Sequence, residues 1–344
     1  MPLVFDYHRV APVQVYDGIK DLGSNPFPYA LVAIMLVVST AVFLISKFFL
    51  GRSKLGTAPR PKGRTNEIQL RGFGSWACAL FFFAVFFISS LPHAGVVVLS
   101  LADDWYGTIL PAAWTSAHYQ EALSHPLVVP SIQNSLLYAS GSTLVDLILG
   151  VAIAWVIVRS TIRGRAILDA LVMLPLAVPG LVLAFGYLAL SQEGRDFHFL
   201  VGAAENPTLL LIIAYAVRRL PYVVRAAVAG LQQSNIALEE AAQSLGATPM
   251  RVLRRISLPL LGANLIAGGI LAFAFAMLEV SDSLILAQQS EHFPITKAIY
   301  ALLGMLGNGY ELASALGVWA MAFLAIAIIG AVVLGGKKGG LFRM

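Results

Sequence analysis

The residues whose types and positions could do chemistry are charged side chains inside long apolar segments. Arg218 and Arg219 interrupt one such segment, and Glu279 and Asp282 interrupt the next one along the chain. If these segments cross a membrane, a charge left alone near the middle of the bilayer costs about 3 kcal/mol or more, so we expect the charges to pair. Arg218 and Glu279 would lie at similar depths in the membrane, so an Arg–Glu pair between the two helices is feasible. Such a pair either locks the helices together, or it lines or gates a path for a transported solute.

No constellation for catalysis or metal binding accompanies these charges. The six histidines are scattered, neither HExxH nor GxSxG occurs, and the single cysteine, Cys78, lies in an apolar run. The phosphate-binding pattern GxxxxGK[ST] is also missing from the sequence. We therefore expect no catalytic site, no metal site and no cofactor in this chain.

Two prolines interrupt an apolar segment upstream of the arginines. Pro175 and Pro179, the latter followed by Gly180, each remove a backbone donor from a helix. In a transmembrane helix, such a pair is either an ordinary kink satisfied by neighbouring groups or a hinge beside a solute path. Both interpretations stand at the level of sequence.

The composition indicates which elements hold these residues. The chain has 344 residues, of which 58% are hydrophobic and 12% are charged, whereas a soluble domain carries roughly 25% charged residues. A membrane-spanning helix needs about 20 mostly apolar residues, and the apolar runs here are continuous rather than alternating. We predict an all-α, polytopic membrane protein with about seven transmembrane helices, at roughly 28–50, 73–101, 132–158, 167–191, 208–232, 263–287 and 312–335.

Basic residues set the expected orientation of these helices. The segments on one side hold 15 Lys and Arg residues and those on the other side hold 4; the basic side comprises 51–71, 159–166, 233–262 and 336–344. Because cytoplasmic loops are enriched in Lys and Arg, the C-terminus is predicted to be cytoplasmic and the N-terminus outside. Residues 1–50 then form an outside tail and an extra helix, which a cytoplasmic basic linker at 51–71 separates from one unit at 72–344. The basic residues belong to loops, so no nucleic acid is expected as a partner.

The most specific pattern is the polar segment EAAQSLGATPMRVLRRISLP at 240–259. A polar helical hairpin of this size must lie on a membrane surface or dock into a partner. Glu239 and Glu240 suit the first turn of a short helix, where the helix dipole favours carboxylates. Gly246 suits a helix end with positive φ, and Pro259 suits the start of the next helix.

This segment resembles the coupling loop of ABC importer permeases, the inner-membrane components of binding-protein-dependent transport. The family pattern of EAA, three residues, Gly, nine residues and Ile-x-Leu-Pro is matched without a gap by Glu240, Ala241, Ala242, Gly246, Ile256, Leu258 and Pro259. The likeness extends over about residues 107–335. The elements R-x-LPY-x-x-R before the loop and LE-x-S after it most resemble the permeases for ferric iron, thiamine and aminoethylphosphonate.

The resemblance implies an importer permease core of six helices at 72–344, with a coupling loop at 234–262 that docks into a separate ATPase. It implies two ABC ATPase subunits that use the ATP, a second permease subunit and a periplasmic or extracellular substrate-binding protein. The location is then the bacterial inner membrane, and the expected substrate is ferric iron or a related small solute. Residues 1–50 resemble the end of a preceding permease half, which favours a different partner permease over a second copy of this chain.

Two other classes of function compete with this interpretation. An ion-coupled secondary transporter acting without an ATPase would explain the intramembrane charges but not the coupling loop. A membrane enzyme or assembly scaffold would need a polar active-site cluster near one face, which the sequence does not provide.

Overall fold

A computed structural model of the chain describes residues 9–18, 25–50, 72–103, 105, 107–201 and 206–339. The described residues are mostly helical, and their single β-bridge joins Ala102 to Trp114. The basic segment 51–71, which the sequence predicts to be a linker, lies outside the described residues.

The long helices agree with most of the predicted spans. They are α2 (Phe27–Leu50), α3 (Phe73–Leu101), α5 (Val128–Arg159), α8 (Thr208–Gln233), α11 (Leu258–Met277) and α14 (Gly309–Gly339). Within the described residues, five helical segments are long and apolar enough to cross a membrane, and one bent helix pair makes a possible sixth. The prediction of an all-α, polytopic chain is confirmed. The remaining predicted span is α8, which carries three arginines, Arg218, Arg219 and Arg225.

The predicted span 167–191 is not one continuous helix. It forms α6 (Arg165–Ala177) and α7 (Gly180–Leu190), whose axes are bent by 103°. Pro175 lies inside α6, whereas Pro179 precedes the first residue of α7. Since proline disfavours helical backbone at the residue before it, the chain breaks at Val178 rather than merely bending there.

The predicted span 263–287 is also shorter than expected. The helix α11 ends at Met277, and a separate short helix, α12 (Ser281–Leu286), follows. The side chain of Glu279 explains the break, because its Oε1 accepts hydrogen bonds from the backbone N–H groups of Ser281, at 3.0 Å, and Asp282, at 3.4 Å. A carboxylate that satisfies free N–H groups stabilises the start of a new helix.

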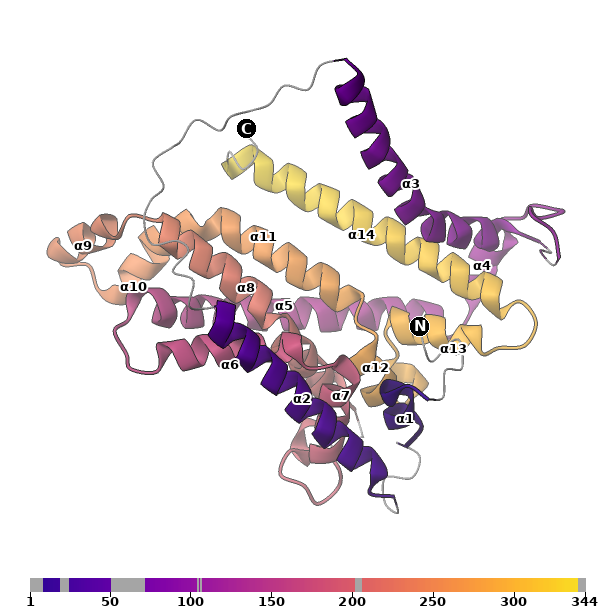
Figure 1. Cartoon of the computed structure of the whole chain (residues 1–344), viewed down its shortest axis with the longest axis horizontal. Coiled ribbons are helices and arrows are strands. Elements are labelled where there is room, and N and C mark those ends of the chain that lie inside the picture. Colours follow the sequence, from indigo (N-terminus) through magenta and orange to yellow (C-terminus); the bar gives the residue numbers. More distant parts are fainter. Residues whose placement is uncertain are drawn as a thin grey trace.

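The helices α5, α8 and α11 lie side by side at the centre of the molecule (Figure 1). On one side of them lie α6, α7 and α2, and on the other lie α14 and α3. The shorter elements gather at the two ends: α9 (Ile236–Ser244) and α10 (Pro249–Val252) at one, and α4 (Ala117–Ser124) and α13 (Ile295–Leu303) at the other. The remaining short helices are α1 (Ala11–Asp17), η2 (His198–Leu200), η3 (Leu253–Ser257) and η4 (Ser290–His292).

Small residues allow the central helices to approach closely. A Cβ atom added at Gly150 of α5 would lie 2.7 Å from Cγ1 of Val223 in α8. One added at Gly268 of α11 would lie 2.7 Å from Cβ of Ala226, also in α8. Membrane helices commonly pack backbone against backbone through such small residues. The helix α8 is therefore held tightly from two sides.

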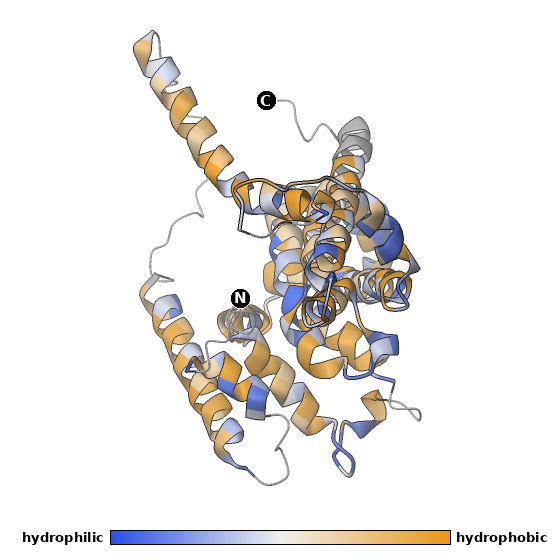
Figure 2. Cartoon of the chain, turned by 90° about the vertical axis from the view of Figure 1, so that its right-hand side faces the viewer, coloured by the Kyte–Doolittle hydropathy of each residue, from blue (hydrophilic) through white to orange (hydrophobic). Residues whose placement is uncertain are grey.

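The helices α2 and α3 have largely apolar, exposed surfaces (Figure 2). Near its end α2 is attached to the core by an ion pair between Lys47 Nζ and Asp169 Oδ2, 3.0 Å apart. The other carboxylate oxygen of Asp169 lies 2.9 Å from Nη1 of Arg225 in α8. One carboxylate thus links α2, α6 and α8.

Candidate functional site

The segment predicted to be a coupling loop forms a short helix, α9, that lies beyond the ends of the long helices (Figure 1). The Asn235 side chain caps α9 by accepting a hydrogen bond, 3.0 Å long, from the backbone N–H of Ala237. Most of the helix faces outward, and its surroundings include four exposed apolar side chains, Ile236, Leu238, Leu245 and Met250. An exposed apolar patch on a polar loop is typical of a protein-binding surface.

The turn after α9 has the geometry that the sequence predicts. Gly246 has a φ of +87°, and no described heavy atom outside its chain neighbours lies within 4 Å of the position a Cβ would take. The N–H of Ala247 donates to the carbonyl of Ala242 at 3.0 Å, and that of Gly246 donates to Gln243 at 2.9 Å. This is the Schellman pattern, in which a left-handed residue ends the helix.

The other half of the loop leads directly into a long helix. The short helix α10, the π-helical turn η3 and α11 follow one another without a gap. Ile256 and Leu258 are half-buried, and Pro259 lies in the first turn of α11. The basic residues Arg251, Arg254 and Arg255 are exposed on this stretch.

Glu239 has a partner within this chain. One guanidinium nitrogen of Arg159, Nε, lies 3.1 Å from Oε2 of Glu239, and a second, Nη2, lies 3.2 Å from Oε1. The Ser257 hydroxyl donates to Oε1 at 3.3 Å, and Arg159 Nη2 also donates to the Ser234 hydroxyl at 2.8 Å. The sequence makes Glu239 and Glu240 candidates for coupling to the ATPase, since both lie in the predicted docking segment 234–262, and of the two only Glu240 is exposed.

The structure also brings together the charged residues of the apolar segments. Arg219 Nη2 donates to a carboxylate oxygen of Glu279 and, at 3.0 Å, to the carbonyl of Phe275. Arg218 Nε lies 3.5 Å from Oε2 of Glu279, which is 4% exposed. The predicted pairing of an arginine in 208–232 with Glu279 is therefore present, with both arginines on one carboxylate. We call this group, with the two aspartates described next, the charged node.

Two further carboxylates complete the charged node. Asp282 is fully buried beside Glu279 and within electrostatic reach of both arginines. Asp146 of α5, which the sequence interpretation missed, is fully buried and within reach of Arg219. Among the described residues, neither aspartate has a hydrogen-bond partner for either carboxylate oxygen. The signal for Asp146 was present, since it is the one charged side chain within the predicted span 132–158.

The break between α6 and α7 presses against the charged node. A Cβ atom added at Gly180 would lie 2.5 Å from the Ser281 hydroxyl oxygen and 2.6 Å from Nη2 of Arg218. Of the two predicted prolines, Pro179 is adjacent to this contact, whereas Pro175 lies half-buried inside α6. The node is thus enclosed by α5, α7, α8 and the α11–α12 break.

The chain after α12 is fastened to α5 and to the node. Asn134 donates to the carbonyls of Glu291, at 2.7 Å, and Phe293, at 3.1 Å. Thr296 donates to the backbone carbonyl of Glu279 at 2.5 Å, so this segment also contacts the α11–α12 break. Nearby, burial lowers the pKa of Lys297 to about 8. This end of the molecule is held by polar contacts to main-chain carbonyls.

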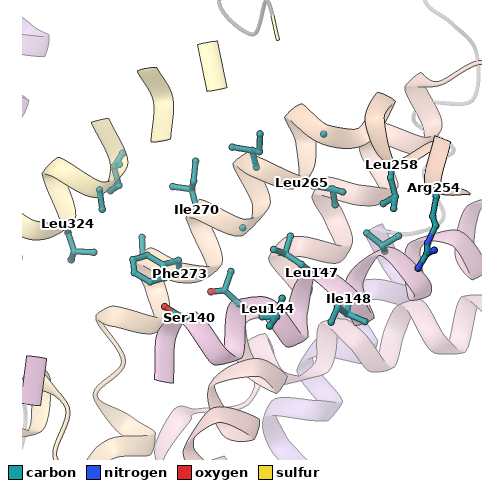
Figure 3. Close-up of a pocket in the computed structure, with 18 residues that line it drawn as sticks. Ser140, Leu144, Leu147, Ile148, Arg254, Leu258, Leu265, Ile270, Phe273 and Leu324 are labelled. Carbon is teal, nitrogen blue, oxygen red and sulfur yellow. The ribbon is translucent and has the colours of Figure 1, made fainter. Parts of the chain in front are cut away.

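Two hollows differ in character. A cavity of about 1070 Å³ lies between α5, α11 and α14, and its lining is apolar apart from Ser140, Thr143 and Arg254, which sits at one end (Figure 3). A smaller hollow of about 500 Å³ lies at the end opposite α9 and is largely polar; its lining includes Ser191, Gln192, Glu193, His198 and Gln288. The second hollow has more of the polar side chains that a hydrophilic solute or protein partner would contact.

Residues 146–335 match the model of a known family, described as the binding-protein-dependent transport system inner membrane component. The sulfate transport system permease protein CysT of Salmonella typhimurium is 33% identical over 175 residues, which cover 50% of this chain and 63% of that protein. The molybdenum transport system permease protein ModB of Escherichia coli is 34% identical over 185 residues, covering 51% and 79%.

A third relative matches over more of the chain. The putative ferric transport system permease protein FbpB 1 of Haemophilus influenzae is 28% identical over 278 residues, covering 80% of this chain but 41% of that protein. The crystal structure of a bacterial ABC transporter that imports the polysaccharide alginate contains a similar chain, with a TM-score of 0.58 and 18% identity over 77% of this chain and 96% of that one. A second structure of an alginate ABC transporter, in complex with its pentasaccharide-bound periplasmic protein, gives a TM-score of 0.60 at 19% identity over 76% and 95%.

Proposed function

Because the chain belongs to the family of binding-protein-dependent transport system inner membrane components, we propose that it is the transmembrane permease subunit of an ATP-driven ABC importer. The observation that carries this proposal is the surface of α9 and its turn. It combines exposed apolar side chains with the exposed carboxylate of Glu240, on a helix that lies beyond the membrane-crossing segments. Such a surface fits helix-in-groove docking on an ATPase.

The coupling-loop residues divide into two roles under this proposal. Glu240, Ala241 and Leu238 face outward and would contact the ATPase, while Gly246 shapes the turn. Ile256, Leu258 and Pro259 would carry the movement into α11. The ATP is bound and hydrolysed by the ATPase subunits, since this sequence has no phosphate-binding pattern of its own.

The two ends of the molecule would face opposite sides of the inner membrane. We place α9 in the cytoplasm, which the excess of Lys and Arg on that side supports. The polar hollow at the other end would then face the substrate-binding protein. Single cysteines at Gln243 and Gln192, in a chain with Cys78 replaced by serine, test this orientation. An impermeant thiol reagent should label the Gln192→Cys protein in intact cells and spare Gln243→Cys; the reverse pattern would invert the topology.

We propose ferric iron as the substrate, within a broader class of small inorganic solutes. The similarity to the ferric relative of Haemophilus influenzae extends over 80% of the chain, whereas the sulfate relative of Salmonella typhimurium and the molybdenum relative of Escherichia coli match about half of it. All three relatives are named for the transport of small inorganic solutes, in contrast to the polysaccharide of the structural neighbours.

Reconstitution tests the class and the substrate together. The chain, its copurifying ATPase and the binding protein are placed in proteoliposomes, and uptake of radiolabelled ferric iron, sulfate and molybdate is measured with and without ATP. We expect ATP-dependent uptake of ferric iron. Uptake of only sulfate or molybdate would overturn the substrate, and uptake without any ATPase would support an ion-coupled secondary transporter instead.

The complete importer would contain two ATPase subunits, a binding protein and a second permease. We favour a different permease chain as that partner, because residues 1–50, which include α2, resemble the end of a preceding permease half. The mass and composition of the cross-linked, detergent-solubilised complex test this. A membrane core with two copies of this chain and no other permease would rule out the separate partner.

A further inference from the structure

We propose that Arg159 and Glu239 form the joint that transmits movement of the docked helix α9 to the transmembrane helix α5. The proposal rests on the proposed function, since the movement originates in an ATPase bound to α9. It assigns a positioning role to Arg159, which lies outside the coupling-loop pattern.

The first observation concerns how α9 is attached. All nine residues of α9 are described, and Glu239 is the only one that is buried, with 5% of its surface exposed. A helix that packed by apolar contacts would bury apolar side chains, and α9 instead turns them outward. Apart from its covalent connections, α9 is therefore held to the body of the protein mainly through one carboxylate.

The second observation concerns the geometry at that carboxylate. Arg159 reaches both oxygens with two different nitrogens, at 3.1 Å and 3.2 Å, so the guanidinium plane fixes the orientation of the carboxylate. Ser257 of η3 contacts the same carboxylate, and Ser234 at the end of α8 contacts the same guanidinium. The ends of three long helical segments thus converge on one ion pair.

This arrangement suits the transmission of movement. Arg159 is the last residue of α5, so a displacement of Glu239 acts directly on the end of a helix 32 residues long. Apolar side chains slide past one another at little cost, whereas a buried two-point ion pair loses charge-assisted hydrogen bonds when it shears. Breaking the pair should therefore let α9 move without α5.

The first test measures coupling in the assembled importer. In proteoliposomes, Arg159→Ala should keep the ATPase bound but lower the solute moved per ATP hydrolysed by about tenfold, the scale of one lost charge-assisted hydrogen bond. Arg159→Lys, which keeps the charge but not the two-point contact, should lower it less. The exchange variant Arg159→Glu with Glu239→Arg should recover part of the coupling. The matched control is Arg163→Ala, which changes an exposed arginine in the loop between α5 and α6 and should behave as the unaltered protein.

Measuring the distance between α9 and the end of α5 shows whether the Arg159–Glu239 pair transmits movement or only stabilises the structure. Spin labels at Gln243 of α9 and Ile162 just beyond α5, both exposed, report how the two elements move when ATP binds, in a chain with Cys78 replaced by serine. In the unaltered joint their separation should stay constant, and in Arg159→Lys it should change with nucleotide.

Three results would overturn the proposal that Arg159 and Glu239 transmit movement from α9 to α5. They are normal solute uptake per ATP in Arg159→Ala, loss of the ATPase from both Arg159 variants, and a label separation that is the same with and without Arg159→Lys. Loss of the ATPase would mean that the pair only maintains the docking surface. Failure of the proposed function would be seen separately, as absence of ATPase from the unaltered protein.

Discussion

The two buried arginine–glutamate groups differ in how completely their polar atoms are bonded. At the α9 end, both oxygens of Glu239 accept hydrogen bonds from Arg159, and Ser257 adds another. In the charged node, the carboxylates of Asp146 and Asp282, Nη1 of Arg218 and Nε of Arg219 have no hydrogen-bond partner among the described residues.

The difference indicates two mechanical roles. A fully bonded ion pair favours one geometry, which suits an element that must move as a unit. Buried polar atoms without hydrogen-bond partners cost about 1–3 kcal/mol each, so a rearrangement that supplied partners would stabilise the node. The node therefore has more to gain from a change of hydrogen-bond partners than the fully bonded pair at α9 has.

The largest effect is expected from removing the common acceptor of the node. Glu279→Ala removes the carboxylate that pairs with the buried Arg219 and the half-buried Arg218, and it should lower the free energy of unfolding by about 3–5 kcal/mol. Thermal unfolding in detergent measures it. Removing an arginine together with Glu279 should harm less than the sum of the single changes, and additive losses in the cycle with Arg218→Ala and Arg219→Ala would show that the residues act separately.

A smaller loss is expected where the α6–α7 break meets the node. Gly180→Ala places a methyl group within 2.6 Å of Arg218 and Ser281, and forced overpacking of this kind costs about 1–3 kcal/mol. Gly186→Ala is the matched control in the same helix, because open space surrounds that position. The melting temperature of Gly180→Ala should be lower than that of Gly186→Ala. Equal stability of the two variants would mean that the break is loosely packed.

At the α9 end, the expected effect on stability is smaller still, and the effect on transport is larger. Gly246→Leu forces a side chain into a left-handed conformation at about 1–2 kcal/mol and extends into the proposed ATPase groove. Gly246→Asn tolerates that backbone better and is shorter. Uptake per ATP should fall strongly for leucine and weakly for asparagine. Normal ATP-driven uptake by Gly246→Leu at normal expression would contradict the role of the turn.

The smallest effect on stability is expected from Asp282, whose carboxylate can be compared with that of Glu279 in the same node. Asp282→Asn removes a buried carboxyl group whose oxygens accept no hydrogen bond within the described residues, so stability should stay unchanged or rise. Glu279→Gln is the matched change at a carboxylate that does accept hydrogen bonds, and it should be destabilising. Similar losses for the two amides, measured by thermal unfolding, would show that the node depends on total charge rather than on particular bonds.

Hydropathy predicts the long helices well, because burial in lipid demands continuous apolar runs. It fails at the end of α11, since Leu278–Val280 contains neither glycine nor proline and the break depends on the Glu279 side chain capping α12. The α6–α7 break has a local signal in Pro179 and Gly180, although not one that gives an angle of 103°.

The candidate sites show the same limit. The Gly246 turn follows from local backbone chemistry, and it was predicted. The partner of Glu239 lies 80 residues away in the sequence, where Arg159 looks like one of many basic loop residues. Only the fold shows that α9 buries a charge in place of an apolar side chain, and that Asp146 belongs to the node.

The uninterrupted helical stretch from Pro249 to Met277 determines how far its far end moves when its near end tilts. These 29 residues form one continuous helical rod, which at 1.5 Å per residue is about 43 Å long. The rod begins at the loop that would rest on the ATPase, and Glu279 lies two residues beyond its far end. A tilt of about one tenth of a radian displaces the tip of a rod this long by roughly 4 Å, which exceeds the length of a hydrogen bond. Leverage alone therefore lets a small movement at the α9 end exchange the partners of Glu279.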